Sequence, residues 1–425
     1  MPDADVIIVG AGLSGITAAY KLASYGRNVI VFERGEYPGS KNVTGGRMYL
    51  HAIKKIINIP LEEMPFERFV TREVVTVLHG LNSFSIELEN YDKQKYQSAT
   101  VLRAIFDKWY ANLAEEKGAN FITKTKVDDL YIEDGFVRGV IVENEKVTSN
   151  VVLISEGVNN FLGLKLGLRK EFMPNYLVTS AKAVIELGEE EINKRFRLKS
   201  REGIAQIFTG QSRGVIGGGF LYTNRETLSI GVVYLLESLV KNKVSIADLF
   251  EDFMYHPSVQ KYIEGGRILE YSGHLIPVKG YGMIPKLVYN GALVSGDAAG
   301  FFLENGPIFR GMDFAIESGS LAAEAIERAI KEGDYSEKTL SYYITLLNNS
   351  FVLKDLKRHR NAPKIMQNER LYSVYPALIN ELLNDFFKVD GTTKQPLLNF
   401  LLNKTTKYIN PITALKDIIE ILMYA

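Results

Sequence analysis

The chain of 425 residues contains no cysteine. This absence excludes disulfides, zinc sites with cysteine ligands, iron–sulfur clusters held by this chain, and a thiol nucleophile. It is compatible with a reducing, cytoplasmic compartment. An excess of charge of one sign is also missing, because 50 Lys and Arg balance 50 Asp and Glu. The overall charge therefore gives no case for a nucleic-acid partner.

Long apolar runs are missing as well. No stretch reaches the ~18 consecutive apolar residues that a membrane-spanning helix needs. The apolar run at residues 5–9 has no basic region before it and enters a glycine turn, which predicts a strand rather than a signal peptide. The five histidines lack metal-ligand spacing, so no metal site is expected: they are His51, His79, His256, His274 and His359.

What is present is an ordinary globular composition, with 46% hydrophobic and 24% charged residues and only 13 prolines. At ~150 residues per domain, the length predicts two or three domains. In the N-terminal part we expect a strand–turn–helix–strand unit over 5–33 and a helix over 102–117. Further strands are expected near 69–89, 120–123, 127–132, 136–143 and 151–154.

The region 172–275 has a different character. Long strands with glycine-rich turns are expected at 176–187, 204–209, 214–222 and 227–236, which together predict an antiparallel sheet. A buried strand at 292–295 and a helix from about Pro307 to Lys331 follow. The last ninety residues are predicted to be helical, with capping or breaking signals at Ser336, Pro376, Pro396 and Pro411.

The sequence Gly10-Ala11-Gly12-Leu13-Ser14-Gly15 lies between the first strand and its helix. The first glycine permits a tight turn, the second lets the backbone approach a pyrophosphate, and the third allows close helix–strand packing. Glu33 ends the next strand, where it is placed to accept hydrogen bonds from a ribose. An acidic residue there argues against a 2′-phosphorylated adenosine. The pattern predicts dinucleotide binding.

A second motif, Gly296-Asp297-Ala298-Ala299-Gly300, follows the strand at 292–295. In FAD enzymes of this topology the aspartate binds the ribityl chain, and the N-terminus of the next helix faces the flavin. The helix dipole there stabilises the reduced, anionic cofactor. The pair of motifs therefore predicts FAD rather than NAD.

Two longer segments carry a family resemblance. Residues 39–49, GSKNVTGGRMY, and residues 304–313, ENGPIFRGMD, closely resemble the flavin-facing segments of FixC-type dehydrogenases. These are relatives of electron-transfer-flavoprotein:quinone oxidoreductase and, more distantly, of geranylgeranyl reductases and aromatic hydroxylases. The resemblance covers most of the chain and is strongest at 5–50, 100–110 and 290–325.

The resemblance implies one extended FAD. Gly10, Gly12, Gly15 and Glu33 would hold the adenosine end, Asp297 the ribityl chain, and Lys41, Asn42, Gly45, Gly46, Gly311 and Met312 would surround the isoalloxazine. Arg103 matches a helix arginine near the cofactor, although an i,i+4 salt bridge with Asp107 is the alternative. Val127, expected in a strand, would offer backbone contacts to adenine. The expected cofactor-binding set also includes Leu13, Ser14, Arg34, Gly157, Gly296 and Gly306.

These inferences predict an α/β chain with a Rossmann-like FAD-binding domain of the glutathione-reductase/hydroxylase type, an inserted antiparallel β-sheet domain and a helical C-terminal region. The predicted boundaries are 1–171 with 276–334, 172–275, and 335–425. The predicted function is electron transfer from a reduced electron-transfer flavoprotein to a membrane quinone. Because this chain has no cysteine, a 4Fe–4S cluster would belong to a separate ferredoxin-like, FixX-type subunit. Lys41 and the helix predicted to start near Pro307 would stabilise the reduced flavin.

Alternatives remain open. A geranylgeranyl-reductase-like enzyme would need a deep, dry tunnel in the β-rich domain, and the cysteine that many such reductases share near the flavin is missing. Hydroxylation of aromatics and a subunit active only in an electron-bifurcating complex are further alternatives. The basic run at 354–364 is either a solvated face or a docking surface. With the apolar residues at 386–387, 397–398, 400–402 and 418–419, it could place the protein peripherally on the inner face of the cell membrane.

Overall fold

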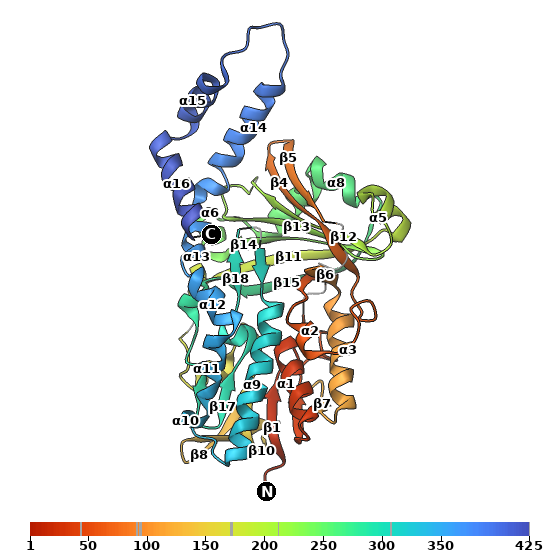
Figure 1. Ribbon diagram of the computed structural model, residues 1–425, viewed down its shortest axis with the longest axis vertical. Coiled ribbons are helices and arrows are strands. Elements are labelled where there is room, and N and C mark those ends of the chain that lie inside the picture. Colours follow the sequence, from red (N-terminus) through yellow and green to blue (C-terminus); the bar gives the residue numbers. More distant parts are fainter. Residues whose placement is uncertain are drawn as a thin grey trace.

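The computed structural model describes residues 1–42, 45–90, 92, 96–170, 173–210, 212–306 and 308–424. The described chain forms two large sheets, with helices against both of them, and a helical C-terminal region (Figure 1). The N-terminus lies at one end of this elongated molecule and part of the C-terminal region at the other.

The first sheet is built around the N-terminal strand. Its order is β16 (Val288–Tyr289), β17 (Ala292–Val294), β10 (Glu145–Ile154), β1 (Ala4–Val9), β2 (Val29–Phe32) and β7 (Asn120–Ile122), with β8 (Asp129–Glu133) and β9 (Phe136–Val142) beside β10. β1 is parallel to both β10 and β2. The central strands are continuous apolar runs because helices cover them, as a parallel sheet requires.

Helices α1 (Leu13–Ser24), α3 (Arg103–Glu116) and α9 (Met312–Glu332) pack beside this sheet (Figure 1). α1 and α9 approach each other closely through a glycine. A Cβ on Gly319 would lie 2.2 Å from the Ser14 carbonyl oxygen, so no larger side chain fits there. The helix expected at 307–331 begins later, at Met312, because the chain just before it forms two short paired strands. The hairpin of β18 (Leu303–Asn305) and β19 (Ile308–Arg310) precedes it, and Pro307 lies outside the described residues.

The second sheet draws on two distant parts of the chain. Its order is β15 (Arg267–Pro277), β11 (Leu177–Glu186), β14 (Thr227–Leu235), β13 (Gly217–Thr223), β12 (Glu202–Thr209), β4 (Arg68–His79), β6 (Ser98–Val101) and β3 (Gly46–Tyr49), with β5 (Asn82–Glu89) beside β4. The sheet is mixed rather than antiparallel throughout, because β4 and β12 run parallel. The domain boundaries at 171/172 and 275/276 stay a prediction, since strands from 46–101 also join this sheet.

Hydrogen bonds from the Arg68 side chain connect β4 to the middle of the chain. Its side chain is fully buried and donates to the carbonyl oxygens of Asn224 (2.6 Å), Ser200 (2.9 Å) and Glu202 (3.0 Å), among others. A buried guanidinium is tolerated when its donors are satisfied in this way.

The middle of the chain also contains helices that we did not expect. They are α5 (Glu189–Phe196), α6 (Leu236–Asn242), α7 (Ile246–Tyr255) and α8 (Pro257–Ile263). Ser245 and His256 cap α7 and α8 by accepting backbone N–H bonds with their side chains. Leu249, Phe250 and Phe253 of α7 pack into the core of the second sheet.

The C-terminal region is helical, as expected, and contains α10 (Glu337–Leu340), α11 (Tyr342–Asn349), α12 (Phe351–Arg358), α13 (Ala362–Met366), α14 (Val374–Phe387), α15 (Leu397–Tyr408) and α16 (Pro411–Tyr424). Ser336 caps α10 and Pro396 precedes α15, whereas Pro376 lies in the first turn of α14 and does not break it. α14 and α15 project beyond the second sheet, and we call this pair the helical arm (Figure 1). Within the described residues, no helix is both long and apolar enough to span a bilayer.

The remaining short elements are α2 (Ile53–Ile56), α4 (Phe161–Lys165), and the 3₁₀ turns η2 (Pro174–Tyr176), η3 (Gly280–Met283), η4 (Gly296–Ala299) and η5 (Glu369–Leu371).

Candidate functional site

A cavity of about 1300 Å³ lies where the two sheets meet. It is larger than the ~300–1,000 Å³ typical of a site for one small ligand. Every residue of the predicted cofactor-binding set lines it except Gly15. Motifs far apart in the sequence thus meet at one site.

The glycine turn after β1 explains why Gly15 is the exception. Gly10 has a φ of +100°, and a Cβ there would lie 2.5 Å from the Ser155 carbonyl oxygen. A Cβ on Gly15 would lie 2.0 Å from the Gly10 carbonyl oxygen. Gly15 therefore serves helix–strand packing, whereas Gly12 borders the cavity with open space above it.

Glu33 supports this turn from the end of β2. One carboxylate oxygen accepts from the Ala11 N–H at 2.9 Å and the other from the Gly35 N–H at 2.6 Å. Each carboxylate oxygen can accept a further bond. The side chain therefore shapes the turn and also lines the cavity, where its contact with a ribose stays a prediction.

Serine hydroxyls join the two short motifs beneath the cavity. The Ser14 hydroxyl donates to the Ser295 hydroxyl at 2.7 Å, and Ser155 lies 2.8 Å from the same oxygen. Gly296 has a φ of +65°, and a Cβ there would lie 2.9 Å from the Ser14 Cβ. The glycines thus let the start of α1 and the turn η4 come together.

Asp297 follows Gly296, and its carboxylate has no hydrogen-bond partner among the described side chains and backbone groups. Burial raises the pKa of Asp297, while the nearby His274 and Arg103 act in the opposite direction. Burial also disfavours the charged form of His274 and so lowers its pKa, whereas the negative charge of Asp297 acts to raise it. An acceptor left open beside the glycine turns suits the hydroxyls of a ribityl chain.

The two family-like segments come into contact beside the cavity. A Cβ on Gly46 would lie 2.9 Å from the Met312 Cε, at the start of α9. Lys41 and Asn42 border the same space. Val43 and Thr44, which belong to the motif, lie outside the described residues.

Arg103 forms the i,i+4 salt bridge considered as the alternative for it, and its place near the cofactor stays a prediction. It lines the cavity and also forms a two-pronged ion pair with Asp107, with both N–O distances at 2.7 Å. The Asn42 amide donates to the same Asp107 carboxylate at 2.8 Å. Asp107 is fully buried and so fixes two cavity-lining side chains at once.

The other predicted residues lie along the rim of the same cavity. Arg34, Gly157 and Gly306 border it. Val127 also borders it, but it lies in the loop before β8 and not in a strand. Whether these residues contact a cofactor stays a prediction.

Known proteins of similar sequence decide the family. Residues 5–153 match the model of the FAD dependent oxidoreductase family, and residues 362–423 match the ETF-QO/FixC family C-terminal domain. The chain is 39% identical over 416 residues, 97% of each chain, to an Escherichia coli K12 protein named "Probable electron transfer flavoprotein-quinone oxidoreductase YdiS". The chain belongs to the ETF-QO/FixC family. Protein FixC of Bradyrhizobium diazoefficiens is 37% identical, covering 92% of this chain and 91% of that protein.

Solved structures agree with a flavoprotein fold for this FixC-family chain. A geranylgeranyl bacteriochlorophyll reductase-like protein of Thermoplasma acidophilum has a TM-score of 0.73 at 20% identity, covering 97% and 98% of the two chains. A flavin-dependent brominase has a TM-score of 0.64 at 16% identity, covering 95% and 98%. These identities establish the fold only.

The cofactor of this FixC-family oxidoreductase is FAD, and the cavity fits it. The open space above Gly12 suits a pyrophosphate, and the unpartnered Asp297 carboxylate suits a ribityl hydroxyl. Gly311 and Met312, at the N-terminus of α9, also line the cavity, and the dipole of this helix favours negative charge there. When bound, FAD supplies the two-electron redox chemistry.

Several ionisable residues of this FixC-family cavity were missed from the sequence, among them Lys182, Arg47 and Glu304. Burial lowers the pKa of Lys182 to about 7, opposed by Glu270 and reinforced by Arg103. Arg47 pairs with Glu73, and Glu304 faces the cavity from the hairpin before α9. Lys182 left a usable signal, because it is a lone cation in the apolar strand β11. Glu304 belongs to a motif that we recognised, but no role was assigned to it.

Proposed function

We propose that this FAD-dependent oxidoreductase takes electrons from a reduced electron-transfer flavoprotein and passes them to a quinone. The observation that carries this proposal is the relation to YdiS over 97% of both chains. The cavity supports it, because its lining combines glycine turns with an apolar region.

That apolar region, which we call the apolar chamber, is defined by Ile276, Phe302, Phe309, Met366, Leu371 and Ile421. These residues come from β15, the β18–β19 hairpin and the C-terminal region. β18 contacts α13, and α13 contacts α16, so the C-terminal helices close this side of the cavity. A planar ring with an isoprenoid tail is the kind of ligand that such an apolar lining favours.

Lys41 is proposed to stabilise the reduced cofactor, because it places a positive charge at the cavity rim. Replacing Lys41 with Met is expected to lower the flavin reduction potential by tens of millivolts, since 1.4 kcal/mol corresponds to ~30 mV for a two-electron couple. Spectroscopic titration against a reference dye measures this shift. Lys54→Met, on exposed α2, is the matched control and should leave the potential unchanged. An equal potential in Lys41→Met and the wild type would refute the role.

We further propose that an iron–sulfur cluster, if one takes part, resides on a separate ferredoxin-like FixX-type subunit. The chain lacks cysteine and so cannot ligate a cluster through thiolates. The chain would lie in the cytoplasm, peripheral on the inner face of the cell membrane. The helical arm supports this placement.

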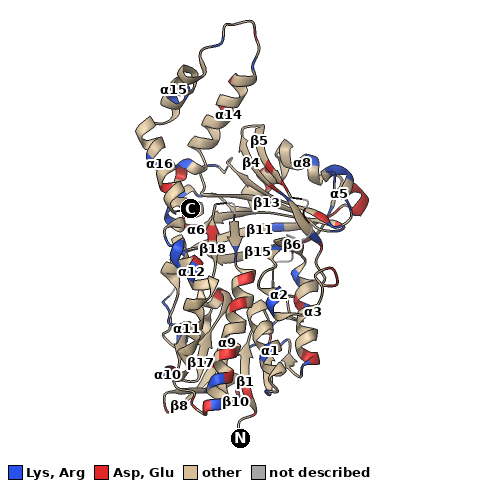
Figure 2. Ribbon diagram, viewed as in Figure 1, with Lys and Arg blue, Asp and Glu red and all other residues tan. Residues whose placement is uncertain are grey.

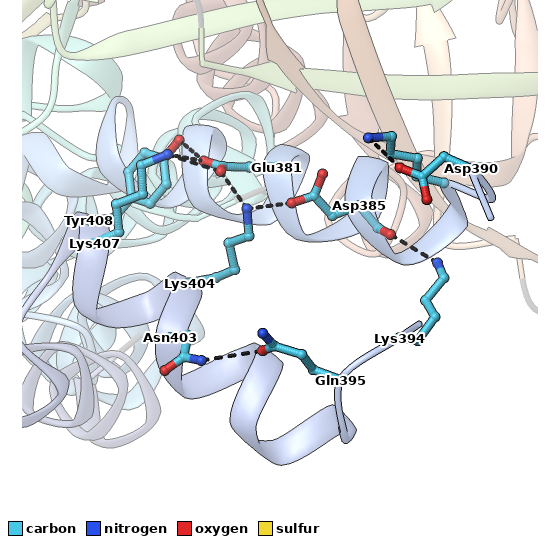
Figure 3. A network of polar contacts seen from close by, with 10 residues as sticks. Glu381, Asp385, Asp390, Lys394, Gln395, Asn403, Lys404, Lys407 and Tyr408 are labelled. Atoms are coloured by element: carbon cyan, nitrogen blue, oxygen red, sulfur yellow. Dashed lines mark hydrogen bonds and ion pairs between the residues drawn. The ribbon is translucent and has the colours of Figure 1, made fainter. Parts of the chain in front are cut away.

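Polar contacts join the two helices of the helical arm (Figure 3). Glu381 of α14 accepts from Lys404 at 2.7 Å, from Lys407 at 3.0 Å and from the Tyr408 hydroxyl, all on the second helix. Lys404 also pairs with Asp385. Figure 2 shows few charged positions elsewhere on these helices. Large apolar side chains are instead exposed on the helical arm and α16: Phe386, Phe387, Leu397, Leu398, Leu402, Ile412, Leu415, Ile418, Ile419 and Leu422.

An apolar surface of this kind suits the interface of a bilayer. We expect the double variant Phe387→Glu/Leu398→Glu to bind vesicles at least ~10-fold more weakly than the wild type, because burying each such side chain contributes ~1.5–3 kcal/mol. Co-sedimentation with phosphatidylcholine vesicles containing phosphatidylglycerol measures the bound fraction. Ile132→Glu, on exposed β8 at the opposite end of the molecule, is the control and should bind normally. Equal binding by all three proteins would exclude the helical arm as the contact surface.

The proposed function is tested by comparing acceptors in anaerobic steady-state assays with reduced electron-transfer flavoprotein as donor. Saturable reduction of a short-chain quinone supports the proposal, and a requirement for the ferredoxin-like partner would place the cluster on the electron path. Consumption of a geranylgeranyl lipid in place of quinone would indicate a prenyl reductase. Activity seen only in an assembled multi-subunit complex would indicate a subunit of a bifurcating system.

A further inference from the structure

Glu304 is an unusual residue for its position. It lies in the middle of β18, opposite Phe309, and lines the cavity beside the apolar chamber. Among the described residues, no cation pairs with its carboxylate and no donor hydrogen-bonds to it. Burial raises the pKa of Glu304 to about 7. A carboxyl group left without a partner in an apolar lining costs stability when it ionises, so its presence points to a role.

Tyr372 is the titratable neighbour of Glu304. It lines the same part of the cavity, and its hydroxyl donates to the Met366 carbonyl oxygen at 2.8 Å. Burial raises the pKa of Tyr372, and the charge of Glu304 adds to this effect. Burial is the cause of the raised pKa of Glu304, with no contribution from a charged group among the described residues. Glu304 is thus a carboxylic acid that can hold a proton near neutral pH.

Quinone reduction needs such a group. Two electrons and two protons must reach the quinone for each quinol formed. FAD, when bound and reduced, would supply the electrons and one proton, so the second proton must come from elsewhere. A group beside the ring, within an apolar lining that admits little water, can provide that proton more readily than bulk solvent.

We propose that Glu304 is the acid that protonates one carbonyl oxygen of the quinone. The carboxylic O–H bond breaks, a quinol O–H bond forms, and the resulting carboxylate regains a proton from water that reaches the cavity. Tyr372 does not itself transfer the proton, because its hydroxyl donates to the Met366 carbonyl oxygen. This inference rests on the proposed function, because it assigns a residue to the reduction of that acceptor.

The test uses the FAD-loaded full chain with Glu304→Gln, which keeps the shape of the side chain but cannot donate this proton. With a short-chain quinone the turnover number should fall on the order of 10²-fold. With ferricenium, which accepts an electron without a proton, it should stay within about twofold. Glu264→Gln, at an exposed position outside the cavity, should match the wild type with both acceptors. The FAD content and thermal unfolding of each variant show that it has folded.

The pH dependence gives a second readout. The wild-type rate with quinone should fall as the pH rises through about 7, while Glu304→Gln should be slow without this inflection. Glu304→Asp should keep part of the rate and the inflection.

Unfolding provides a readout that does not involve activity. The unfolded chain releases this proton near its ordinary pKa of 4.5, whereas the folded chain keeps it until about 7. The stability of the wild type should therefore decline relative to Glu304→Gln between pH 4.5 and 7, and the difference should stay constant above that. Urea unfolding of both proteins across this range measures the difference.

The outcomes are distinct. If the wild type does not reduce quinone at all, the proposed function fails and the inference fails with it. If the wild type reduces quinone and Glu304→Gln does so equally fast with the same pH profile, the inference alone is overturned. Parallel stability curves for the two proteins would also overturn it, because Glu304 would then not be a neutral acid in the folded chain.

Discussion

Replacing Gly15 with alanine is expected to destabilise the protein by at least ~1–3 kcal/mol and to abolish FAD binding. The added methyl group would lie 2.0 Å from the Gly10 carbonyl oxygen, and backbone on both sides of the contact leaves no flexible atom to move. α1 must then shift away from β1. Urea unfolding and FAD retention after gel filtration measure the two effects.

Gly12→Ala is the matched variant, because the same methyl group added three residues earlier meets nothing within 4 Å. The φ of Gly12 is −84°, which alanine adopts without strain. We therefore expect normal stability of the FAD-free protein and at least ~10-fold weaker FAD binding, since the methyl group occupies space in the cavity. Equal behaviour of the two variants would contradict the separate roles assigned to these glycines.

The second large effect is expected at Asp107. Its carboxylate is fully buried and holds both Arg103 and Asn42. Asp107→Ala leaves the Arg103 guanidinium without its anion, and removing one partner of a buried pair costs ~3–5 kcal/mol. It also frees two cavity-lining side chains, so FAD affinity should fall together with stability. Chemical denaturation and fluorescence titration with FAD measure these changes.

The control for Asp107 is an exposed pair of the same spacing. Arg328 and Glu332 are also four residues apart and lie 2.7 Å from each other, but both side chains are more than two-fifths exposed. Glu332→Ala should change stability by less than ~1 kcal/mol and leave FAD affinity unchanged. If Asp107→Ala lowers the free energy of unfolding no more than Glu332→Ala does, burial does not increase the contribution of the Arg103–Asp107 ion pair to stability.

Local patterns in the sequence were enough to predict much of the fold. The glycine turn, the strand that ends at Glu33 and the Gly296-Asp297 turn are all encoded by neighbouring residues, and each is found as an element of the first sheet or its turns. The helices at 246–255 and 257–263 were not predicted, because the whole region 172–275 was interpreted as an antiparallel sheet.

Long-range pairing could not be predicted in the same way. The parallel contact of β4 with β12 joins Val74 to Gln206, and nothing near either residue specifies the other. For the same reason the position of Lys182 beside Gly45 could not be predicted. A Cβ on Gly45 would lie 3.3 Å from the Lys182 Nζ. The predicted cofactor-binding residues came from recognised motifs, whereas the side chains that complete the cavity come from the second sheet and the C-terminal helices.

The most direct test of the account is the reoxidation of the reduced protein by a quinone. The FAD-loaded chain is reduced anaerobically with reduced electron-transfer flavoprotein, mixed rapidly with a short-chain quinone, and followed by flavin absorbance. The account predicts reoxidation at a rate that saturates with quinone concentration, with quinol formed in equal amount. A flavin that stays reduced at every quinone concentration, with the ferredoxin-like partner present or absent, would contradict it.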